Sequence, residues 1–461
     1  MNSPTVTTRL ISRCLNDIPA RIDEAALDTA RKCLIDSIAV ALAARNEDGI
    51  RILRSELAAG RKPEEAAIIG AGDRVPADVA ALVNGMMISI LLFDDNHMSM
   101  RGHPSAPIAP VVLALGDKHD LPLEKALRAF VLGYEVESWL GLWFNPSQYE
   151  IGWHATATQG TLGAAVAASY LLGLDMDRAA RALGIAGSLA GGLRTNFGTM
   201  TMSFHAGVAA SSGIQAAQLA AKGFSANADL FGGALGIGRV LSREWDDQGF
   251  SEAVNRIGEP LQIIDPGPVL KIYPCGRPPL PAVDCVMEII NKHGVSADDV
   301  ARIECRVSYM YPRTLIHPRP QTGLQAKTSL EGCVAIAFVD NGPRLSSFTD
   351  AAVQRPAVQK LMEKITVTVP PELSENVPEV RRAPFDQPVT VTVATHDGRS
   401  FTETVRDHRG MPANPATDAD IRRKFIGCAE GVLDTERVDE IIGYVHRPDA
   451  SVRGLLTLLN G

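Results

Sequence analysis

The stretch TQGTLGAAVAASYLLGL, residues 158–174, decides the fold class. Its apolar residues recur at helical spacing, and its middle is crowded with glycine and alanine. Small side chains let neighbouring helices approach closely, so we expect a central helix here. This stretch and the apolar residues 80–93 are shorter than the ~20 residues that cross a bilayer. We therefore predict buried helices of a protein that does not enter the membrane.

The same periodicity predicts helices on both sides of that stretch. Residues 24–45 place Leu27, Leu34 and Ile38 at helical spacing. Further helices are predicted at residues 123–134, 178–189 and 206–222. Because no alternating pattern of any length is present before about residue 262, the first part of the chain is predicted to be all-helical.

The pattern changes after residue 262. Residues 300–308 and 364–369 alternate apolar and polar side chains, as half-buried strands do. Two more such runs, 388–395 and 400–405, flank an Asp-Gly pair that predicts a hairpin. Helical patterns occur at residues 281–293 and 329–338. This part is therefore predicted to be α+β.

Two more helices are predicted at residues 421–432 and 437–444, after a capping-box pattern at 417–420. We predict a mainly α protein in which residues 1–265, completed by 413–461, form a large helical domain. Residues 266–412 then form a smaller α+β lid domain inserted in it.

Composition excludes several classes of protein. Of 461 residues, 46% are hydrophobic and 21% charged, which excludes a disordered chain. The net charge is −8, and no run of Lys and Arg suggests nucleic-acid binding. The seven cysteines form no Cys-x-x-Cys pair, so we expect buried thiols in a reducing compartment. With no signal peptide recognisable, the predicted location is cytoplasmic.

The densest polar cluster follows the apolar residues 80–93. It contains acids, bases and a cation that together can act as acid, base and anion clamp, namely Asp94, Asp95, His97, Arg101 and His103. Their spacing matches no metal motif. A purely structural loop, with an Asp as helix cap and His-Pro as a turn, is the alternative.

Two other places carry candidate chemistry. His154 precedes the central helix, and the helix dipole there disfavours a charged imidazole, although a lone histidine is more often structural. Lys271 and Arg277 are set among prolines and can hold a carboxylate, and Lys327 can serve likewise. A bare linker would look similar to the 271–279 segment. His205 is expected to pack or cap at the start of a helix.

Together these segments resemble the 2-methylcitrate dehydratase (MmgE/PrpD) family, which includes cis-aconitate decarboxylase and iminodisuccinate epimerase. The resemblance runs over nearly the whole chain. It is carried by FDD at residues 93–95, HPS at 103–105, GWHAT at 152–156, GTM at 198–200, HAG at 205–207, KIYP at 271–274, AKTS at 326–329, NP at 414–415 and KF at 424–425.

The resemblance implies a helical domain with an α+β lid, a homodimer, and an active site in the cleft between the domains. It also implies that no metal or organic cofactor is required, and that the substrates are small di- and tricarboxylates.

Several positions depart from the family pattern. Leu92 stands where the family usually has Asp, and Met202 where a lysine is expected. Leu280 replaces an expected histidine, and Gly332 an expected tyrosine. Thr328 replaces a phenylalanine. Because most of these changes remove polar groups, the fold carries over more directly than the reaction.

The remaining residues permit a proton-transfer mechanism. Cations that hold a carboxylate make the neighbouring α-proton more acidic. His154 or His103 would take that proton, with Asp94 or Asp95 orienting a histidine. The leading hypothesis is a cofactor-independent, dehydratase-type lyase acting on a hydroxy di- or tricarboxylate such as 2-methylcitrate. The alternatives are an epimerase, isomerase or decarboxylase of a related acid, and a non-catalytic carboxylate-binding paralogue.

Overall fold

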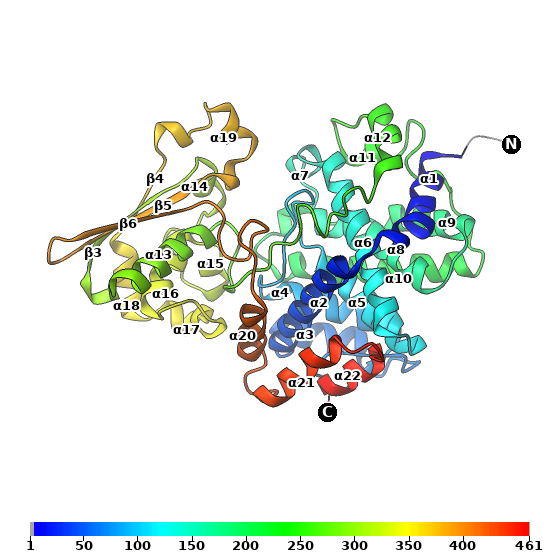
Figure 1. The fold of residues 1–461 in the computed structure, drawn as a ribbon, viewed down its shortest axis with the longest axis horizontal. Coiled ribbons are helices and arrows are strands. Elements are labelled where there is room, and N and C mark those ends of the chain that lie inside the picture. The colour runs from blue at the N-terminus through cyan, green and yellow to red at the C-terminus, as the bar shows by residue number, and fades with distance from the viewer. Residues whose placement is uncertain (1–3, 461) are drawn as a thin grey trace. The chain divides into compact units, whose positions relative to one another are not determined.

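The computed structural model describes residues 4–460 and divides the chain into two compact units (Figure 1). Unit 1 is Met1–Leu270 with Asp418–Gly461, and unit 2 is Lys271–Thr417. Helices make up 59% of the residues that the structure describes and strands 8%, which confirms the mainly α class with a smaller α+β part. Within residues 4–460, no helix is both long and apolar enough to cross a membrane.

The core of unit 1 is a group of tightly packed helices. Its members are α4 (Ala77–Ile90), α5 (Ser105–His119), α6 (Leu123–Phe144), α8 (Ala155–Leu171) and α10 (Met200–Ala221). Their glycines set the packing distance, because a Cβ on Gly207 of α10 would lie 2.1 Å from the carbonyl oxygen of Leu82 in α4. A Cβ on Gly213 would lie 2.4 Å from the Ala164 Cβ in α8. The helix predicted from residues 158–174 is therefore central, as expected.

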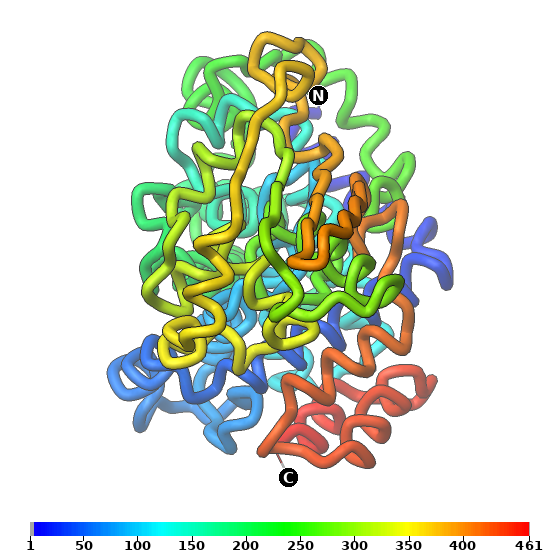
Figure 2. The backbone as a smooth tube through the Cα atoms, turned by 90° about the vertical axis from the view of Figure 1, so that its left-hand side faces the viewer, coloured from blue at the N-terminus to red at the C-terminus, as the bar shows by residue number. Residues whose placement is uncertain are grey.

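Other helices enclose this core. Those with a predicted counterpart are α2 (Glu24–Ala44), α9 (Met176–Leu189), α20 (Asp418–Cys428) and α21 (Thr435–Val445). The remaining ones are α1 (Val6–Ser12), α3 (Asp48–Leu53), α7 (Ser147–Glu150), α11 (Ile237–Leu241), α12 (Asp247–Ala253) and α22 (Val452–Asn460). The C-terminal helices lie together, with α20 packed on α2 and α22 on α5 (Figure 2).

Two expectations for unit 1 need correction. The region contains strands β1 (Ala66–Ala67) and β2 (Arg74–Val75), which pair antiparallel but are too short to show a periodicity. Helix α10 begins at Met200, so His205 lies inside the helix rather than at its start. The seven cysteines of the chain are all buried, as expected.

Unit 2 is built on a four-stranded sheet in the order β4-β3-β5-β6. Strands β3 (Val300–Arg306) and β4 (Ile365–Thr368) are parallel, whereas β5 (Val389–Thr395) and β6 (Ser400–Val405) form the predicted antiparallel hairpin. Alternate residues of β5 are buried, including Val389, Val391 and Val393. Because α13 (Leu280–His293) packs against β5 and β6, those valines belong to the core of unit 2.

The other helices of unit 2 are short. They are α14 (Met310–Thr314), α15 (Gly323–Lys327), α16 (Leu330–Val339), α17 (Asp350–Val353), α18 (Pro356–Glu363) and α19 (Pro378–Arg382). Helix α16 is the one predicted from residues 329–338, and it packs between α13 and α18.

Candidate active site

An aspartate–histidine pair lies at the start of α5 in unit 1. The His103 Nδ1 is 3.0 Å from Asp94 Oδ2, and Asp94 is fully buried whereas the His103 side chain is 20% exposed. A carboxylate on Nδ1 holds the proton on that nitrogen, and so leaves Nε2 as the basic atom. The His103 backbone N–H donates to Thr156 Oγ1 at 3.0 Å, which ties this loop to the first turn of α8.

Asp95 has a different role from its neighbour. Its carboxylate accepts hydrogen bonds from the Ser105 Oγ at 2.7 Å and from the Ser105 backbone N–H at 3.1 Å. It is 1% exposed, and burial raises its pKa to about 7 against the opposing effect of these hydrogen bonds. Asp95 therefore anchors the first turn of α5, while Asp94 is the carboxylate that reaches a histidine.

A second pair of side chains, made of two imidazoles, forms where α8 meets α10. The His154 Nδ1 lies 3.0 Å from the His205 Nδ1, so one ring must donate a proton that the other accepts. His154 occupies the N-cap position of α8, as predicted from the sequence. The sequence did not predict that His205 pairs with His154. The two histidines are 51 positions apart, so their proximity depends on helix packing and not on local pattern.

The loop after α9 holds His154 in place. The His154 N–H donates to the Gly192 carbonyl at 3.0 Å, and the Arg194 N–H donates to the Gly152 carbonyl at 2.9 Å. Gly192 has a φ of +140°, and a Cβ there would lie 2.5 Å from the Ala157 Cβ. A glycine is therefore required at this position for the loop to approach the two rings.

Electrostatics keep the second pair uncharged. The pKa of His154 lies well below its usual value, chiefly because the ring is buried and secondarily because His103, His205 and Arg194 lie near. Burial also lowers the pKa of His205. Neutral imidazoles at neutral pH can both accept and donate a proton, as general acid–base chemistry requires.

The remaining residues of the first cluster belong to neither pair. His97 is 1% exposed, its Nε2 lies 3.1 Å from the Gln262 carbonyl, and its ring meets the edge of Tyr134. Burial lowers its pKa to about 4. His97 is therefore packed in the core of unit 1, and its contact with substrate stays a prediction. Arg101 is exposed in a left-handed turn with φ of +52°, and its role in binding stays a prediction.

The predicted cations of unit 2 are more buried than a linker would allow. Lys271 is 1% exposed and Lys327 7% exposed, and the Gly276 N–H donates to the Lys327 carbonyl at 2.8 Å. The Arg277 Nη2 pairs with Asp386 at 2.8 Å, so part of its charge is already neutralised. His408, which was not predicted, is buried nearby, and its pKa of about 4 reflects burial first and then the charges of Arg277 and Lys271.

The positions that depart from the family pattern have the following surroundings in the structure. Leu280 is buried in the core of unit 2, and Leu92 occupies a left-handed turn with φ of +55°. A Cβ on Gly332 would lie 2.9 Å from the Pro320 Cγ. A tyrosine at 332 would therefore need a rearranged loop at Pro320. Met202 lies in the first turn of α10, three residues before His205.

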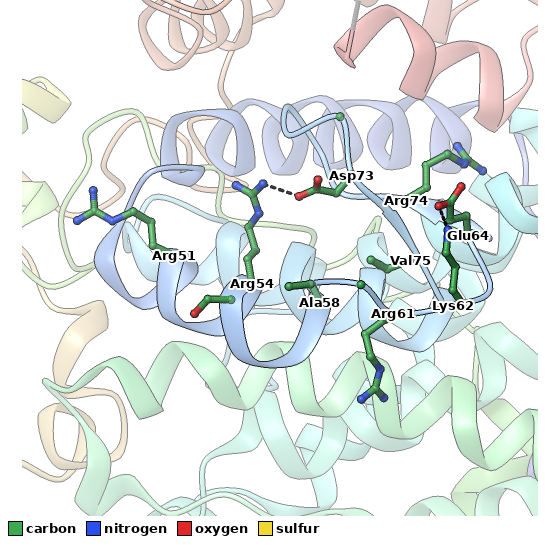
Figure 3. A pocket seen from close by; sticks show the side chains of 13 residues that line it. Arg51, Arg54, Ala58, Arg61, Lys62, Glu64, Asp73, Arg74 and Val75 are labelled. Atoms are coloured by element: carbon green, nitrogen blue, oxygen red, sulfur yellow. Dashed lines mark hydrogen bonds and ion pairs between the residues drawn. The ribbon is translucent and has the colours of Figure 1, made fainter.

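A cavity of about 730 Å³ also opens on unit 1, beside η3 (Arg54–Ala58) and the β1–β2 turn. Figure 3 shows Arg54 directed at Asp73 and Lys62 at Glu64, while Arg61 points away from both pairs. None of the residues that line it is a histidine, so it lacks a group that titrates near neutral pH. The imidazole pairs, and not this cavity, are the candidate active site.

Across residues 4–460, no three His, Cys, Asp or Glu side chains are grouped so that they would hold a metal ion.

Comparison with known proteins gives matches over most of the chain. The MmgE/PrpD N-terminal domain matches residues 14–248, and the MmgE/PrpD C-terminal domain matches residues 273–447. The cis-aconitate decarboxylase of Homo sapiens is 29% identical over 407 residues, which cover 84% of this chain and 80% of that protein. That of Aspergillus terreus is 26% identical over 476 residues, covering 96% and 93%. The 2-methylcitrate dehydratase of Cupriavidus necator is 24% identical over 413 residues, covering 83% and 81%. These relatives support a lyase of the decarboxylase or dehydratase type.

Proposed function

The chain belongs to the MmgE/PrpD family, and we propose that it is a cofactor-independent lyase acting on a small polycarboxylate. The observation that carries the proposal is the presence of two histidine-containing pairs in unit 1. One joins His103 to Asp94, and the other joins His154 to His205. Elimination of water needs a base for the α-proton and an acid for the leaving hydroxide, and two separate imidazole systems can supply both.

In the proposed dehydration, the Nε2 of His103 removes the proton from the carbon next to a carboxylate. Asp94 stabilises the imidazolium that forms, as a carboxylate on Nδ1 does in other proton-transfer sites. The electron pair of the broken C–H bond forms the double bond, and the C–O bond breaks. The departing hydroxide takes a proton from an N–H of the His154–His205 pair and leaves as water. At the end of the cycle the pair regains a proton from solvent and the His103 imidazolium releases the proton that it took.

Decarboxylation is the second candidate, and the named relatives favour it. Here the bond to a carboxylate carbon breaks, carbon dioxide leaves, and the electron pair stays on the remaining carbon framework. An imidazole then protonates that carbon. Either reaction passes a proton between carbon and imidazole, so His103 and His154 are the proposed catalytic residues in both.

We further propose that Lys271, Arg277 and Lys327 of unit 2 bind substrate carboxylates, with Arg101 as an additional cation. Lys271 and Lys327 are buried, which supports a specific rather than a general electrostatic role for these two cations. A homodimer is proposed from the family resemblance alone, and a cytoplasmic location stays the prediction made from the sequence.

The test is turnover of candidate acids by the purified protein. With 2-methylcitrate, loss of water followed by NMR supports the dehydratase, and with cis-aconitate, loss of carbon dioxide supports the decarboxylase. Deuterium incorporation without loss of either group would replace the lyase proposal with an epimerase. Thermal stabilisation by acids that are never turned over would indicate a binding protein.

A further inference from the structure

The segment that carries Asp94 has no regular structure of its own. Residues 93–96 lie between α4 and α5 and form neither helix nor extended strand. Their position must therefore be fixed by contacts with other elements. Each of the four residues makes such a contact, and two of these contacts involve the places where the chain leaves and re-enters unit 1.

The first of these contacts is with the part of the chain that leaves unit 1. The Asn96 N–H donates to the Val269 carbonyl at 3.0 Å, and the Val269 N–H donates to the Asn96 carbonyl at 2.8 Å. Val269 is the penultimate residue before unit 2 begins at Lys271. One end of the segment is thus bound to the chain as it leaves unit 1.

The second contact is at the return. Helix α20 begins at Asp418, the first residue after unit 2, and it carries Lys424. The Lys424 Nζ donates to the Phe93 carbonyl at 2.6 Å, and it lies 3.9 Å from the centre of the Phe93 ring. It also pairs with Asp36 of α2 at 2.5 Å, and each of these two charged side chains is only 2% exposed.

We infer that Lys424 is a positioning residue, which holds the Phe93 carbonyl and thereby places Asp94 against His103. The inference rests on the proposed function of that pair. A fully buried ion pair contributes little net stability, because desolvation opposes the attraction between the charges. Besides its ion pair with Asp36, the Lys424 ammonium group donates a hydrogen bond to the carbonyl of Phe93, the residue before Asp94. An apolar side chain cannot donate that hydrogen bond.

The test separates this role from a contribution to folding. Lys424→Met alone leaves the Asp36 carboxylate buried opposite an apolar side chain, so we expect a clearly lower Tm. Asp36→Asn/Lys424→Met removes both charges, so we expect a Tm within a few degrees of the wild type. In the double variant, kcat should fall at least tenfold while KM changes by less than twofold. Arg422 lies on the same helix as Lys424 and forms a surface pair with Asp439 of α21. Arg422→Met removes that pair, and as the matched control it should leave both constants unchanged.

Amide hydrogen exchange provides a readout that does not depend on turnover. Exchange at residues 93–97 should be faster in the double variant than in the wild type and in Arg422→Met. If the wild type turns over no acid, the proposed function fails, and this exchange experiment still decides the inference. Recovery of kcat together with Tm, or unchanged exchange at residues 93–97, would overturn it.

A second variant covers the case in which the double variant does not fold. Lys424→Arg keeps a positive charge opposite Asp36 but moves the donor atoms, because a guanidinium is larger and planar. We expect a folded protein with reduced kcat and faster exchange at residues 93–97. Wild-type values of both would equally overturn the inference.

Discussion

At the scale of single residues, the candidate site combines two histidines with different environments. His103 is partly exposed and has a carboxylate partner, whereas His154 is 4% exposed and has an imidazole partner. Such a difference in environment is how proteins assign distinct acid and base roles to similar side chains. The sequence suggested both histidines and left open whether Asp94 or Asp95 orients one of them. The structure places Asp94 beside His103 and His205 beside His154.

Replacing either histidine tests its role directly. His103→Ala and His154→Ala should each lower kcat/KM by about 10²-fold or more, because general acid–base catalysis supplies roughly that factor. His446→Ala, at an exposed histidine of unit 1, is the control and should match the wild type. Near-wild-type rates in both site variants would remove the two residues from the mechanism.

Glu137 of α6 gives a prediction about pH and stability. Its side chain is fully buried, and neither carboxylate oxygen has a hydrogen-bond partner within residues 4–460. Burial, with a further effect from Asp95, raises its pKa well above 4.5, so the folded state retains the proton. A raised pKa contributes stability at low pH that is lost as the pH rises. Relative to Glu137→Gln, the wild type should therefore become progressively less stable above about pH 4.5.

Urea unfolding at pH 5 and pH 8 measures this difference. The free energy of unfolding of Glu137→Gln minus that of the wild type should be larger at pH 8. Glu56→Gln, at an exposed glutamate of unit 1, serves as the control and should show no such trend. A difference for Glu137→Gln that is the same at both pH values would contradict the account.

Arg277 tests the proposed carboxylate binding in unit 2. Arg277→Ala should raise KM with little change in kcat if the guanidinium binds the ground and transition states alike. Because Asp386 competes for the same guanidinium, Asp386→Asn should change KM in the opposite direction. Steady-state kinetics on the two variants would rule out the carboxylate clamp if KM were unaltered in both.

At the scale of elements, helical periodicity was sufficient to predict most of the long helices but not all of their ends, and it missed short helices such as α1 and α12. The predicted helix at residues 123–134 continues to Phe144, because its later turns still bury Val136, Leu140 and Phe144 at helical spacing. The strands of unit 2 match the alternating runs closely, since one face of the sheet is buried. Strands β1 and β2 were missed because two residues cannot establish an alternation.

Close packing between α10 and its neighbours gives the prediction at this scale. In Gly207→Ala, the new Cβ would meet the Leu82 carbonyl at 2.1 Å, so the two helices must separate. We expect a loss of about 1–3 kcal/mol in the free energy of unfolding, as for other overpacked cores. Gly443→Ala in α21 is the matched control, since nothing lies within 4 Å of its Cβ position. It should be stabilising by ~0.5–1 kcal/mol because alanine favours helix more than glycine. Equal effects on urea unfolding would contradict the packing argument.

At the scale of the whole molecule, the order of motifs along the chain indicated the family, and the matches to both of its domains confirm it. The contacts of Lys424 could not be predicted in the same way, because they join residues 331 positions apart. Nor could sequence distinguish His97, which packs in the core, from His103, which is partly exposed six residues later. Local pattern thus identified candidate side chains, while tertiary packing determines which of them lie close together.

The most direct test of the central claim follows protons in deuterium oxide. The purified protein is incubated with 2-methylcitrate or cis-aconitate, and the products are read by NMR. We predict that at least one acid loses water or carbon dioxide, and that His154→Ala abolishes this turnover while remaining folded. If the folded wild-type protein neither eliminates a group from these acids nor exchanges their carbon-bound hydrogens, the imidazole pairs do not perform the chemistry proposed for them.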